Sequence, residues 1–398
     1  MLHRSESKFL FYAILVSEIV KLLPFVLSLF GVSDSSVFIS LIRYVLMIIA
    51  SFYLLKYVLN NHLKISFLQK LFIIWIVYLY LTAIPDIVNP YKNHLYFKQF
   101  LLSFMFLYLI PLMMIAELDI EFLKRLFKFC YFLAVAYIVV VILFAKYDDE
   151  GCTLFAEGVI ILMMTWPYHK PKQRIVVILV FVIAIVGMML AARRNKVVFF
   201  GGGLLFALII NIISSSSYGA SRKVFLVLLL LAFGVGLYFN MSSFGLFFER
   251  MHTGMESREG IIELFVDDFN SHPSDWVYGR GIYGEFDGGA LNTKDELGLR
   301  DGIENGYLQL ILKGGGIWLG LLTIIALNAV YKGLFKSKNL LCKGFAMIIL
   351  LYYLDMIGFG IPTVSLKYFM VFLAIAGCNT TWLLECSDDY LAKEIGLK

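Results

Sequence analysis

The feature that most constrains this chain is the recurrence of long apolar segments along nearly its whole length. Most of them reach about 17 residues or more, enough for a helix to cross the roughly 30 Å hydrocarbon layer of a membrane. The segments are continuously apolar, whereas the strands of a membrane barrel alternate apolar and polar residues. Since only helices and closed barrels satisfy their backbone polar groups in lipid, the sequence predicts an all-α, polytopic transmembrane helical bundle.

Composition and charge narrow the class further. The chain has 60% hydrophobic and 16% charged residues, and its mean hydropathy is +0.83; soluble domains carry about a quarter charged residues. A net charge of +5 gives no indication of nucleic-acid binding. The five cysteines show no metal-like spacing and no disulfide framework. We therefore predict no metal site, no cofactor and no nucleic-acid partner.

We predict a single membrane domain, residues 1–398, with about twelve spans. The first is expected to be retained rather than cleaved as a signal, because it carries charges and lacks a small-residue cleavage site. Lys and Arg concentrate in one set of loops, and positive residues favour the cytoplasmic face, so both termini are expected to be cytoplasmic. The predicted spans are residues 9–30, 37–55, 68–85, 97–116, 127–145, 153–167, 175–192, 197–214, 224–241, 306–330, 341–359 and 367–385.

Two cation-bearing segments fall on the opposite, extracytoplasmic face. One is the turn holding Arg193, Arg194 and Lys196, and the other is the large periplasmic loop 242–305 between spans nine and ten. Cations packed into a short turn oppose the rule that positive residues stay on the cytoplasmic side. We expect either lipid phosphate or an anionic substrate to compensate them.

The long loop has a local pattern of its own. Thr253 followed by Glu256 fits a capping box, and apolar residues then recur at helical spacing until Pro273. This predicts an amphipathic helix that lies on the membrane surface or roofs a cavity. The glycines of residues 278–284 match a dinucleotide-binding pattern literally, but no βαβ unit surrounds them. We expect them instead to permit tight turns close to a ligand or to the bundle.

Three polar groups are expected to face the same aqueous side: the Arg193 and Arg194 pair, two arginines at the start of the loop, and Glu304 with Asn305 at its end. The planar guanidinium of arginine binds phosphate oxygens bidentately. Arginines that converge at a membrane surface therefore suit a lipid-linked diphosphate. For any single arginine the alternative is a surface ion pair or a lipid contact.

Charged residues also occur inside the apolar segments. Each costs about 2.5–3.5 kcal/mol at a helix centre on insertion scales, so they should face the bundle interior or reach toward the interface. Glu18 and Lys21 are three residues apart in one helix and are expected to neutralise each other. The charged residues in question are Glu18, Lys21, Arg43, Glu157 and Asp355.

Two of these stretches resemble a known family. ENGYLQLILKGGGIWLG (304–320) is similar to the signature of the O-antigen polymerase and ligase superfamily, and ARRNKVVFFGGG (192–203) resembles its arginine motif at the mouth of a span. Arg258, followed by an apolar helix and then glycines, resembles its large periplasmic loop. Ligases of this superfamily typically carry His where this chain has Glu304, which favours a polymerase and keeps the ligase as the alternative. A transporter or flippase is the alternative from another class, and the paired halves that mark transporters are missing from the sequence.

The resemblance implies a GT-C-like glycosyltransferase in the bacterial inner membrane that polymerises oligosaccharide repeat units on its periplasmic side. Donor and acceptor would be glycans linked to undecaprenyl pyrophosphate, transferred without a metal and with inversion. Membrane lipid, a chain-length regulator and a flippase of the same pathway are the implied partners. For Glu304 the alternative role is a helix N-terminal acid favoured by the dipole, and for Tyr307 and Gln309 it is packing in the first turn of a helix. The candidate catalytic residues are Arg193, Arg194, Arg258 and Glu304, and the candidate substrate-binding residues are Arg250, Arg280, Asn305, Tyr307 and Gln309.

Overall fold

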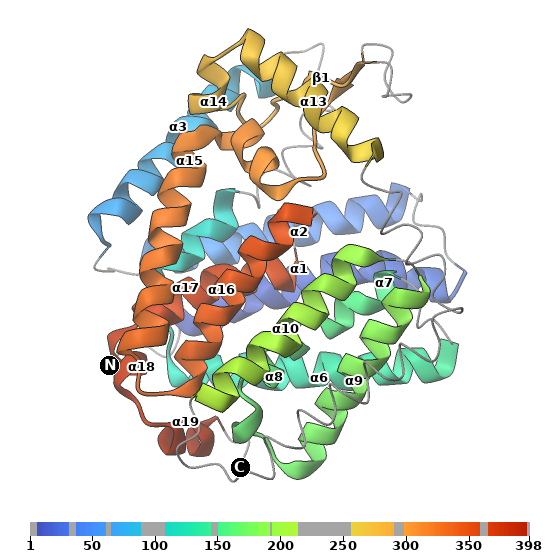
Figure 1. The fold of residues 1–398 in the computed structure, drawn as a ribbon, viewed down its shortest axis with the longest axis vertical. Coiled ribbons are helices and arrows are strands. Elements are labelled where there is room, and N and C mark those ends of the chain that lie inside the picture. Colours follow the sequence, from blue (N-terminus) through green and yellow to red (C-terminus); the bar gives the residue numbers. More distant parts are fainter. Residues whose placement is uncertain are drawn as a thin grey trace.

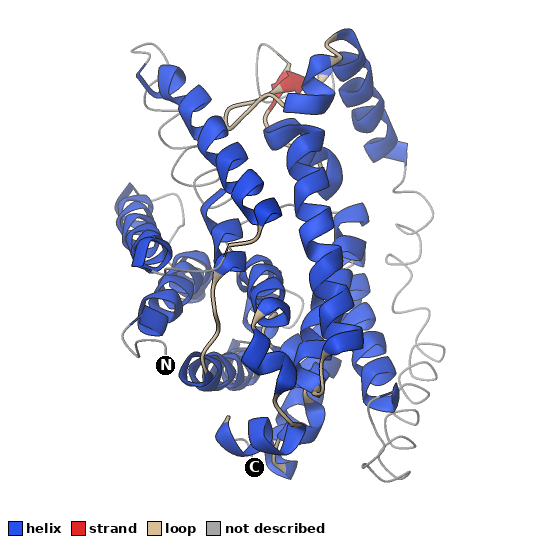
Figure 2. Cartoon of the chain, turned by 90° about the vertical axis from the view of Figure 1, so that its left-hand side faces the viewer, coloured by secondary structure: helices blue, strands red, loops and turns tan. Residues whose placement is uncertain are grey.

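The protein, seen in a computed structural model, is built almost entirely of helices. The structure describes residues 6–31, 37–60, 65–88, 108–144, 150–191, 193–213, 256–289, 298–358 and 365–395. Within these residues the strands are limited to one short antiparallel pair, β1 (Phe286–Asp287) with β2 (Leu299–Arg300), which lies at one end of the molecule (Figure 2).

In the part of the chain that the structure describes, eight helices are long and apolar enough to cross a membrane. Their lengths and composition confirm the prediction of an all-α, multi-pass membrane protein. The eight helices are α1 (Glu6–Leu29), α2 (Val37–Asn60), α3 (Phe67–Val88), α6 (Ile120–Phe144), α9 (Pro171–Leu190), α10 (Arg194–Ile213), α15 (Gly306–Tyr331) and α16 (Leu340–Gly358).

Two predicted spans are not continuous helices. Residues 153–167 are broken into α7 (Glu150–Thr153), η3 (Leu154–Ala156), α8 (Val159–Met164) and η4 (Trp166–Tyr168). Residues 367–385 divide into α17 (Leu366–Asn379) and α18 (Thr381–Glu385), and α19 (Asp388–Glu394) follows. Span 224–241 lies outside the described residues, and the described end of span 97–116 is a 3-10 helix, η2 (Ile110–Ile115).

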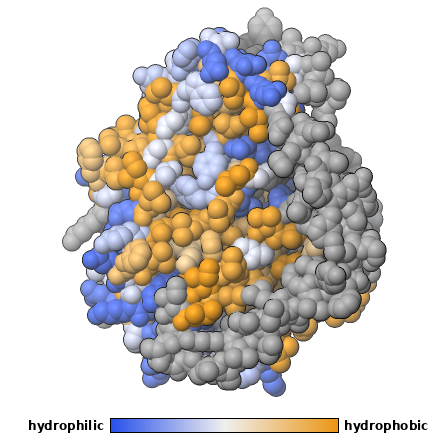
Figure 3. All heavy atoms as spheres, viewed as in Figure 1, coloured by the Kyte–Doolittle hydropathy of each residue, from blue (hydrophilic) through white to orange (hydrophobic). Residues whose placement is uncertain are grey.

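The short elements of the long loop lie together at one end of the molecule. Helices α13 (Glu256–Ser271) and α14 (Ser274–Tyr278) lie at the upper end in Figure 1 with β1, and α15 descends from them toward α18 and α19 at the lower end. In Figure 3 hydrophobic residues cover the middle of this face, while hydrophilic residues gather near α13 and at the lower left. An apolar band between two polar ends is the surface expected of a chain embedded in lipid.

Helix α15 is kinked at Gly315, where the backbone leaves the helical region (φ 72°, ψ 176°). A kink breaks backbone hydrogen bonds, so the carbonyl groups just before it need other partners. The carbonyls of residues 312–314 accept hydrogen bonds, in order, from the Arg280 backbone N–H at 2.8 Å, the Tyr108 hydroxyl at 2.5 Å and the Trp75 indole N–H at 2.8 Å. Three separate parts of the chain are thereby attached to the kink.

The glycine-rich turn of the long loop crosses α15 at this kink. A Cβ on Gly279 would lie 2.5 Å from the Gly315 nitrogen, and a Cβ on Gly315 would lie 2.1 Å from the Val277 carbonyl oxygen. Both glycines also have a φ in the left-handed region, 71° and 72°. Two backbones can approach this closely only where neither carries a side chain. Of the glycines in residues 278–284, Gly279 thereby confirms the expected close approach to the bundle.

Helix α13 confirms the predicted helix after Glu256, but its apolar face covers protein. Phe265 and Phe269 are fully buried, and with Phe286 of β1 and Leu312 of α15 they form a small second core. We expected this face to lie on the membrane surface or over a cavity, but its two phenylalanines pack against β1 and α15 instead. Thr253, the predicted cap, lies outside the described residues.

Candidate functional site

The break between η3 and α8 places Glu157 at the centre of a buried ion cluster. Its carboxylate forms ion pairs with Lys21 of α1 and Lys196 of α10, each at 3.2 Å, and accepts a hydrogen bond from the Lys367 backbone N–H at 3.2 Å. The side chain of Glu157 is only 1% exposed. Gly158, the next residue, packs closely against the neighbouring helix, because a Cβ on it would lie 3.0 Å from the Cys130 sulfur.

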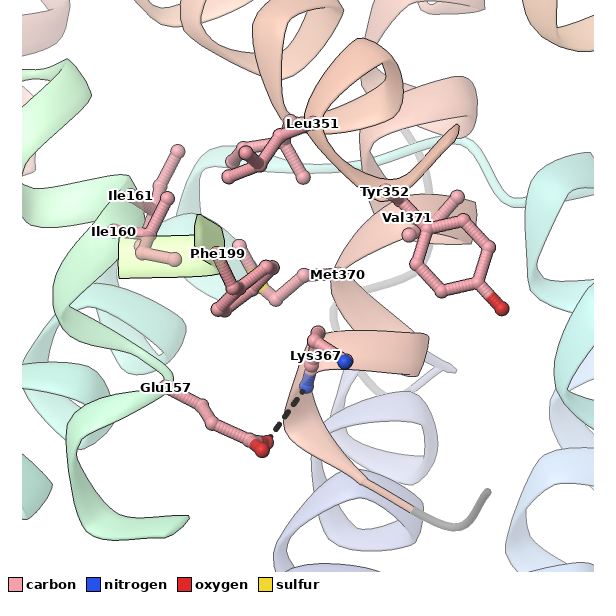
Figure 4. Close-up of a pocket in the computed structure, with 10 residues that line it drawn as sticks. Glu157, Ile160, Ile161, Phe199, Leu351, Tyr352, Lys367, Met370 and Val371 are labelled. Atoms are coloured by element: carbon pink, nitrogen blue, oxygen red, sulfur yellow. Dashed lines mark hydrogen bonds between the residues drawn. The ribbon is translucent and has the colours of Figure 1, made fainter. Parts of the chain in front are cut away.

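A second ion pair extends the cluster to the end of α16. Lys367, at the start of α17, places its ammonium 2.6 Å from Asp355, and both side chains are largely buried. Figure 4 shows Glu157 and Lys367 facing each other beside an apolar pocket whose wall includes Phe199 and Met370. The volume of that pocket is about 10 Å³, room for one water at most. The pocket is therefore too small for a substrate.

The pairing within the cluster differs from the sequence expectation for Lys21. We expected Lys21 to pair with Glu18 on the same helix, and this prediction was wrong, because Lys21 pairs with Glu157, 136 residues away. A buried charge costs several kcal/mol unless a charged partner and hydrogen bonds compensate it. Glu157 compensates two ammonium groups and one backbone N–H at once.

The cluster compensates one of the three cations in residues 193–196. Lys196 is buried and bound to Glu157, so the compensating group for this cation is a carboxylate of the protein. Arg193, three residues earlier, is exposed. The side chain of Arg194 lies outside the described part of the structure, but its backbone begins α10. The start of α10 therefore combines a buried, neutralised cation with one that faces outward.

The start of α15 carries the second predicted group. Glu304 is exposed, and Asn305 caps the helix, its side-chain oxygen accepting from the N–H groups of Tyr307 and Leu308 at 3.1 Å. The Gln309 side chain is buried and accepts from the Ile303 N–H at 2.9 Å. Asn305, Tyr307 and Gln309 thus have structural roles in the first turn, and their roles as substrate contacts stay predictions.

The two predicted groups are connected through the end of α16. Asn305 donates to the Ile357 carbonyl at 3.4 Å, and the Tyr307 hydroxyl donates to the Tyr353 carbonyl at 2.7 Å. Asp355 lies between those two residues of α16 and forms an ion pair with Lys367. The backbone N–H of Lys367 donates to Glu157, which in turn forms an ion pair with Lys196. The start of α15 is therefore bonded to the last turns of α16, and the same turns are linked through Asp355, Lys367 and Glu157 to Lys196 at the start of α10.

The arginines predicted in the long loop are placed only in part. Arg250 and the side chain of Arg258 lie outside the described structure, although the backbone of Arg258 belongs to α13. Their convergence with Arg193 stays a prediction. Arg280 is well defined: its guanidinium donates to Asp268 through two nitrogens, at 2.6 and 3.0 Å, to Asp275 at 2.7 Å, and to a backbone carbonyl. These contacts hold the loop together, so a substrate role for Arg280 gains no support from them.

The ion pair between Asp268 and Arg280 also affects the pKa of the Asp268 carboxyl. Burial raises the pKa of the Asp268 carboxyl, but hydrogen bonds from Arg280 and from a backbone N–H outweigh it, so the pKa falls below the ordinary 3.8. A carboxyl whose pKa is lowered by folding stabilises the folded state above its unfolded pKa. That stability is lost as the pH falls through the lowered value, so the loop should loosen only in acid below about pH 3.8.

Removing Arg280 should loosen the loop at neutral pH. In the variant Arg280→Gln, two neighbouring carboxylates lose their shared cation, and we expect hydrogen exchange in peptides from α13 to become at least about tenfold faster, since losing hydrogen bonds to charged groups costs roughly 1.5–3 kcal/mol each. Mass spectrometry of the purified protein measures this exchange. Arg300→Gln is the matched control, an arginine of the same loop for which the described structure records no ion pair. Equal exchange in both variants would show that Arg280 does not organise the loop.

Sequence reasoning missed the role of the cluster, although it singled out most of its members. Lys21, Glu157 and Asp355 were noted as charges inside apolar segments, and Lys196 as a cation on the extracytoplasmic face. No local pattern shows that they meet, because their partners are 39, 136 and 210 residues apart. Among the described residues, no group of three His, Cys, Asp or Glu side chains is arranged to hold a metal ion.

Comparisons of the chain with protein-family models, with curated proteins and with solved structures give no match.

Proposed function

We propose that this protein is a membrane glycosyltransferase that polymerises lipid-linked oligosaccharide repeat units. The observation that supports the proposal is that both stretches resembling the O-antigen polymerase and ligase superfamily are bonded, directly or through Glu157 and Lys367, to the last turns of α16. One stretch carries an exposed arginine, Arg193, and the other an exposed carboxylate, Glu304.

The proposed reaction joins two lipid-linked glycans. A hydroxyl oxygen of the acceptor repeat unit attacks the anomeric carbon of the donor, and the bond from that carbon to the pyrophosphate oxygen breaks with inversion. Undecaprenyl pyrophosphate leaves with the electron pair, and the acceptor proton passes to Glu304 as general base. Arg193, Arg194 and Arg258 would stabilise the charge that develops on the pyrophosphate, as divalent ions do in other glycosyl transfers.

The buried cluster supports this scheme by fixing the start of α10. A helix N-terminus favours anions through its dipole and its unpaired N–H groups, and α10 is 20 residues long. Because Lys196 is anchored to Glu157 at 3.2 Å, the two arginines that precede it are attached to a rigid point. A positioned arginine stabilises developing charge better than a mobile one, since less reorganisation is needed.

The proposed topology has twelve spans, including residues 97–116 and 224–241. Both termini would be cytoplasmic, and the loop 242–305 would lie in the periplasm of a bacterial inner membrane. The polar end that carries α13 and α14 (Figure 1) would then face the periplasm, where the glycans are presented. The ligase alternative differs only in the acceptor, a lipid A core in place of a second repeat unit.

The purified protein should convert a lipid-linked repeat unit into a ladder of products on a gel. With Arg193→Ala we expect the rate to fall about tenfold, equivalent to ~1.4 kcal/mol, because other cations share the charge. With Glu304→Gln, which cannot accept the proton, we expect a fall of about a hundredfold. Arg125→Ala and Glu121→Gln on α6 are the matched controls and should keep the wild-type rate.

Absence of any ladder from folded wild-type protein would refute the polymerase. A single transfer to added lipid A core, with no ladder, would identify the ligase instead. Wild-type rates in both Arg193→Ala and Glu304→Gln would refute the assignment of the site even if the activity is found.

A further inference from the structure

A second pocket lies beside the glycine-rich turn, away from the ion cluster. Its volume is about 180 Å³, several times the roughly 30 Å³ that one water occupies in the liquid. It is formed between the last turns of α3 and the segment that follows α14. The lining residues are Tyr78, Leu79, Thr82, Ala83, Tyr278, Gly279, Arg280, Gly281, Ile282 and Tyr283.

Aromatic rings form one side of this pocket. Tyr78 and Tyr278 are 44% and 51% exposed, so the protein leaves part of each ring uncovered. Trp75 packs against both, with its ring centroid 4.9 Å from that of Tyr78 and 6.2 Å from that of Tyr278. The face of an aromatic ring carries negative charge density, which attracts the weakly positive C–H groups on one face of a saturated, hydroxyl-bearing ring.

The rest of the pocket is polar but carries no available charge. The Thr82 hydroxyl donates to the Leu79 carbonyl at 3.0 Å, so its oxygen still has lone pairs that can accept. Gly281 leaves that hydroxyl uncovered, since even a Cβ there would lie 4.0 Å from it. The one cation of the lining, Arg280, is bound by the carboxylates of Asp268 and Asp275. A neutral ligand therefore fits this pocket better than a phosphate.

The pocket is held rigid by the kink in α15. Trp75 donates to the Gly314 carbonyl, and the Arg280 backbone N–H donates to the Leu312 carbonyl, both at 2.8 Å. The two walls of the pocket are thus attached to the same three residues of one helix. A preformed site of this kind loses little entropy on binding.

We propose that this pocket binds one neutral sugar ring of the glycan, with the C–H face of the ring against Tyr78 and Tyr278 and a hydroxyl at Thr82. The inference rests on the proposed function, because that function supplies a neutral saccharide at this end of the protein. The pocket would hold a sugar at a distance from the ion cluster and so fix which residue of the repeat unit reaches the reacting groups.

The test is saturation-transfer NMR on the full-length protein in lipid nanodiscs. The probes are the methyl glycosides of glucose, galactose, mannose, rhamnose, N-acetylglucosamine and N-acetylgalactosamine. We expect transfer to the ring protons of at least one probe, and a fall of about fivefold or more in Tyr78→Ala and in Tyr278→Ala. Tyr278→Phe keeps the ring and should keep the signal, as should Tyr390→Ala, an exposed tyrosine of α19.

No transfer to any probe, or equal transfer in the wild type and both alanine variants, would overturn the proposal. The thermal midpoint of each variant, measured alongside, excludes variants that have unfolded. Because binding is read separately from catalysis, the two ideas can fail independently. Protein that binds a probe through these tyrosines but extends no lipid-linked unit counts against the polymerase only, and a normal ladder from both alanine variants counts against the pocket only.

Discussion

Replacing Glu157 by alanine is expected to lower the free energy of unfolding by about 3–5 kcal/mol, the range found when one partner of a buried ion pair is removed. The ammonium groups of Lys21 and Lys196 would lose the carboxylate they share, and the Lys367 N–H would lose its acceptor. The two lysine side chains are only 18% and 10% exposed, so water cannot replace the lost partner fully.

Thermal unfolding of the purified protein can be followed with a thiol-reactive dye. Four of the five free cysteines are buried, Cys130, Cys152, Cys342 and Cys378, so the dye reacts with them as the fold opens. The midpoint of this reaction should fall clearly in Glu157→Ala. Glu121→Ala, which removes a surface carboxylate paired with Lys124 at 3.3 Å, should shift it little, because such pairs contribute roughly 0–1 kcal/mol.

A compensated variant separates the loss of charge balance from the loss of packing. Combining Glu157→Met with Lys21→Met and Lys196→Met removes the unpaired cations together with the carboxylate. Apolar replacement of a whole buried ion cluster is often neutral, so this triple variant should regain most of the lost stability. A triple variant no more stable than Glu157→Ala would show that charge sharing is not the reason for the effect.

Replacing Gly315 by alanine is expected to be the second large perturbation. Its backbone, at φ 72° and ψ 176°, lies in a region that essentially only glycine adopts, and another residue there costs about 1–3 kcal/mol. The added Cβ would also lie 2.1 Å from the Val277 carbonyl oxygen, so the turn must move away. Overpacking of this kind adds about 1–3 kcal/mol.

The same dye assay and hydrogen exchange of residues 276–284 measure this effect. Gly320→Ala is a matched control in the same helix, because a Cβ there has open space around it and alanine is the better helix former by up to about 1 kcal/mol. We expect Gly315→Ala to lower the midpoint and speed exchange in the turn, and Gly320→Ala to leave both unchanged or raise the midpoint. Similar behaviour of the two variants would contradict the close crossing at Gly315.

The fold could be predicted from the sequence as far as hydrophobicity determines it. The spans predicted at 175–192, 306–330 and 341–359 agree with α9, α15 and α16 to within a few residues. Apolar composition identifies segments that lie in lipid, but it does not show whether a segment is one continuous helix. Residues 153–167 are as apolar as a span, yet they break into short helices where Glu157 turns toward three lysines.

The chemical roles of the candidate site residues stay predictions, and the structure shows only part of their surroundings. Sequence motifs selected the start of α10 and the start of α15, and both are bonded, directly or through Glu157 and Lys367, to the last turns of α16. The pairing of Lys21 was misjudged, since the rule for neighbours on one helix favours Glu18, while the observed partner Glu157 lies on another element. Contacts between distant segments depend on how helices pack, which local spacing does not record.

The kink in α15 also bears on the order in which the chain is assembled. Its carbonyls are satisfied by Trp75, Tyr108 and Arg280, and all three residues precede α15 in the sequence. During synthesis these donors leave the ribosome before the helix that needs them. The last quarter of the protein, from α15 onward, is therefore synthesised after the groups that satisfy the carbonyls at its kink, so these partners are already present when α15 forms.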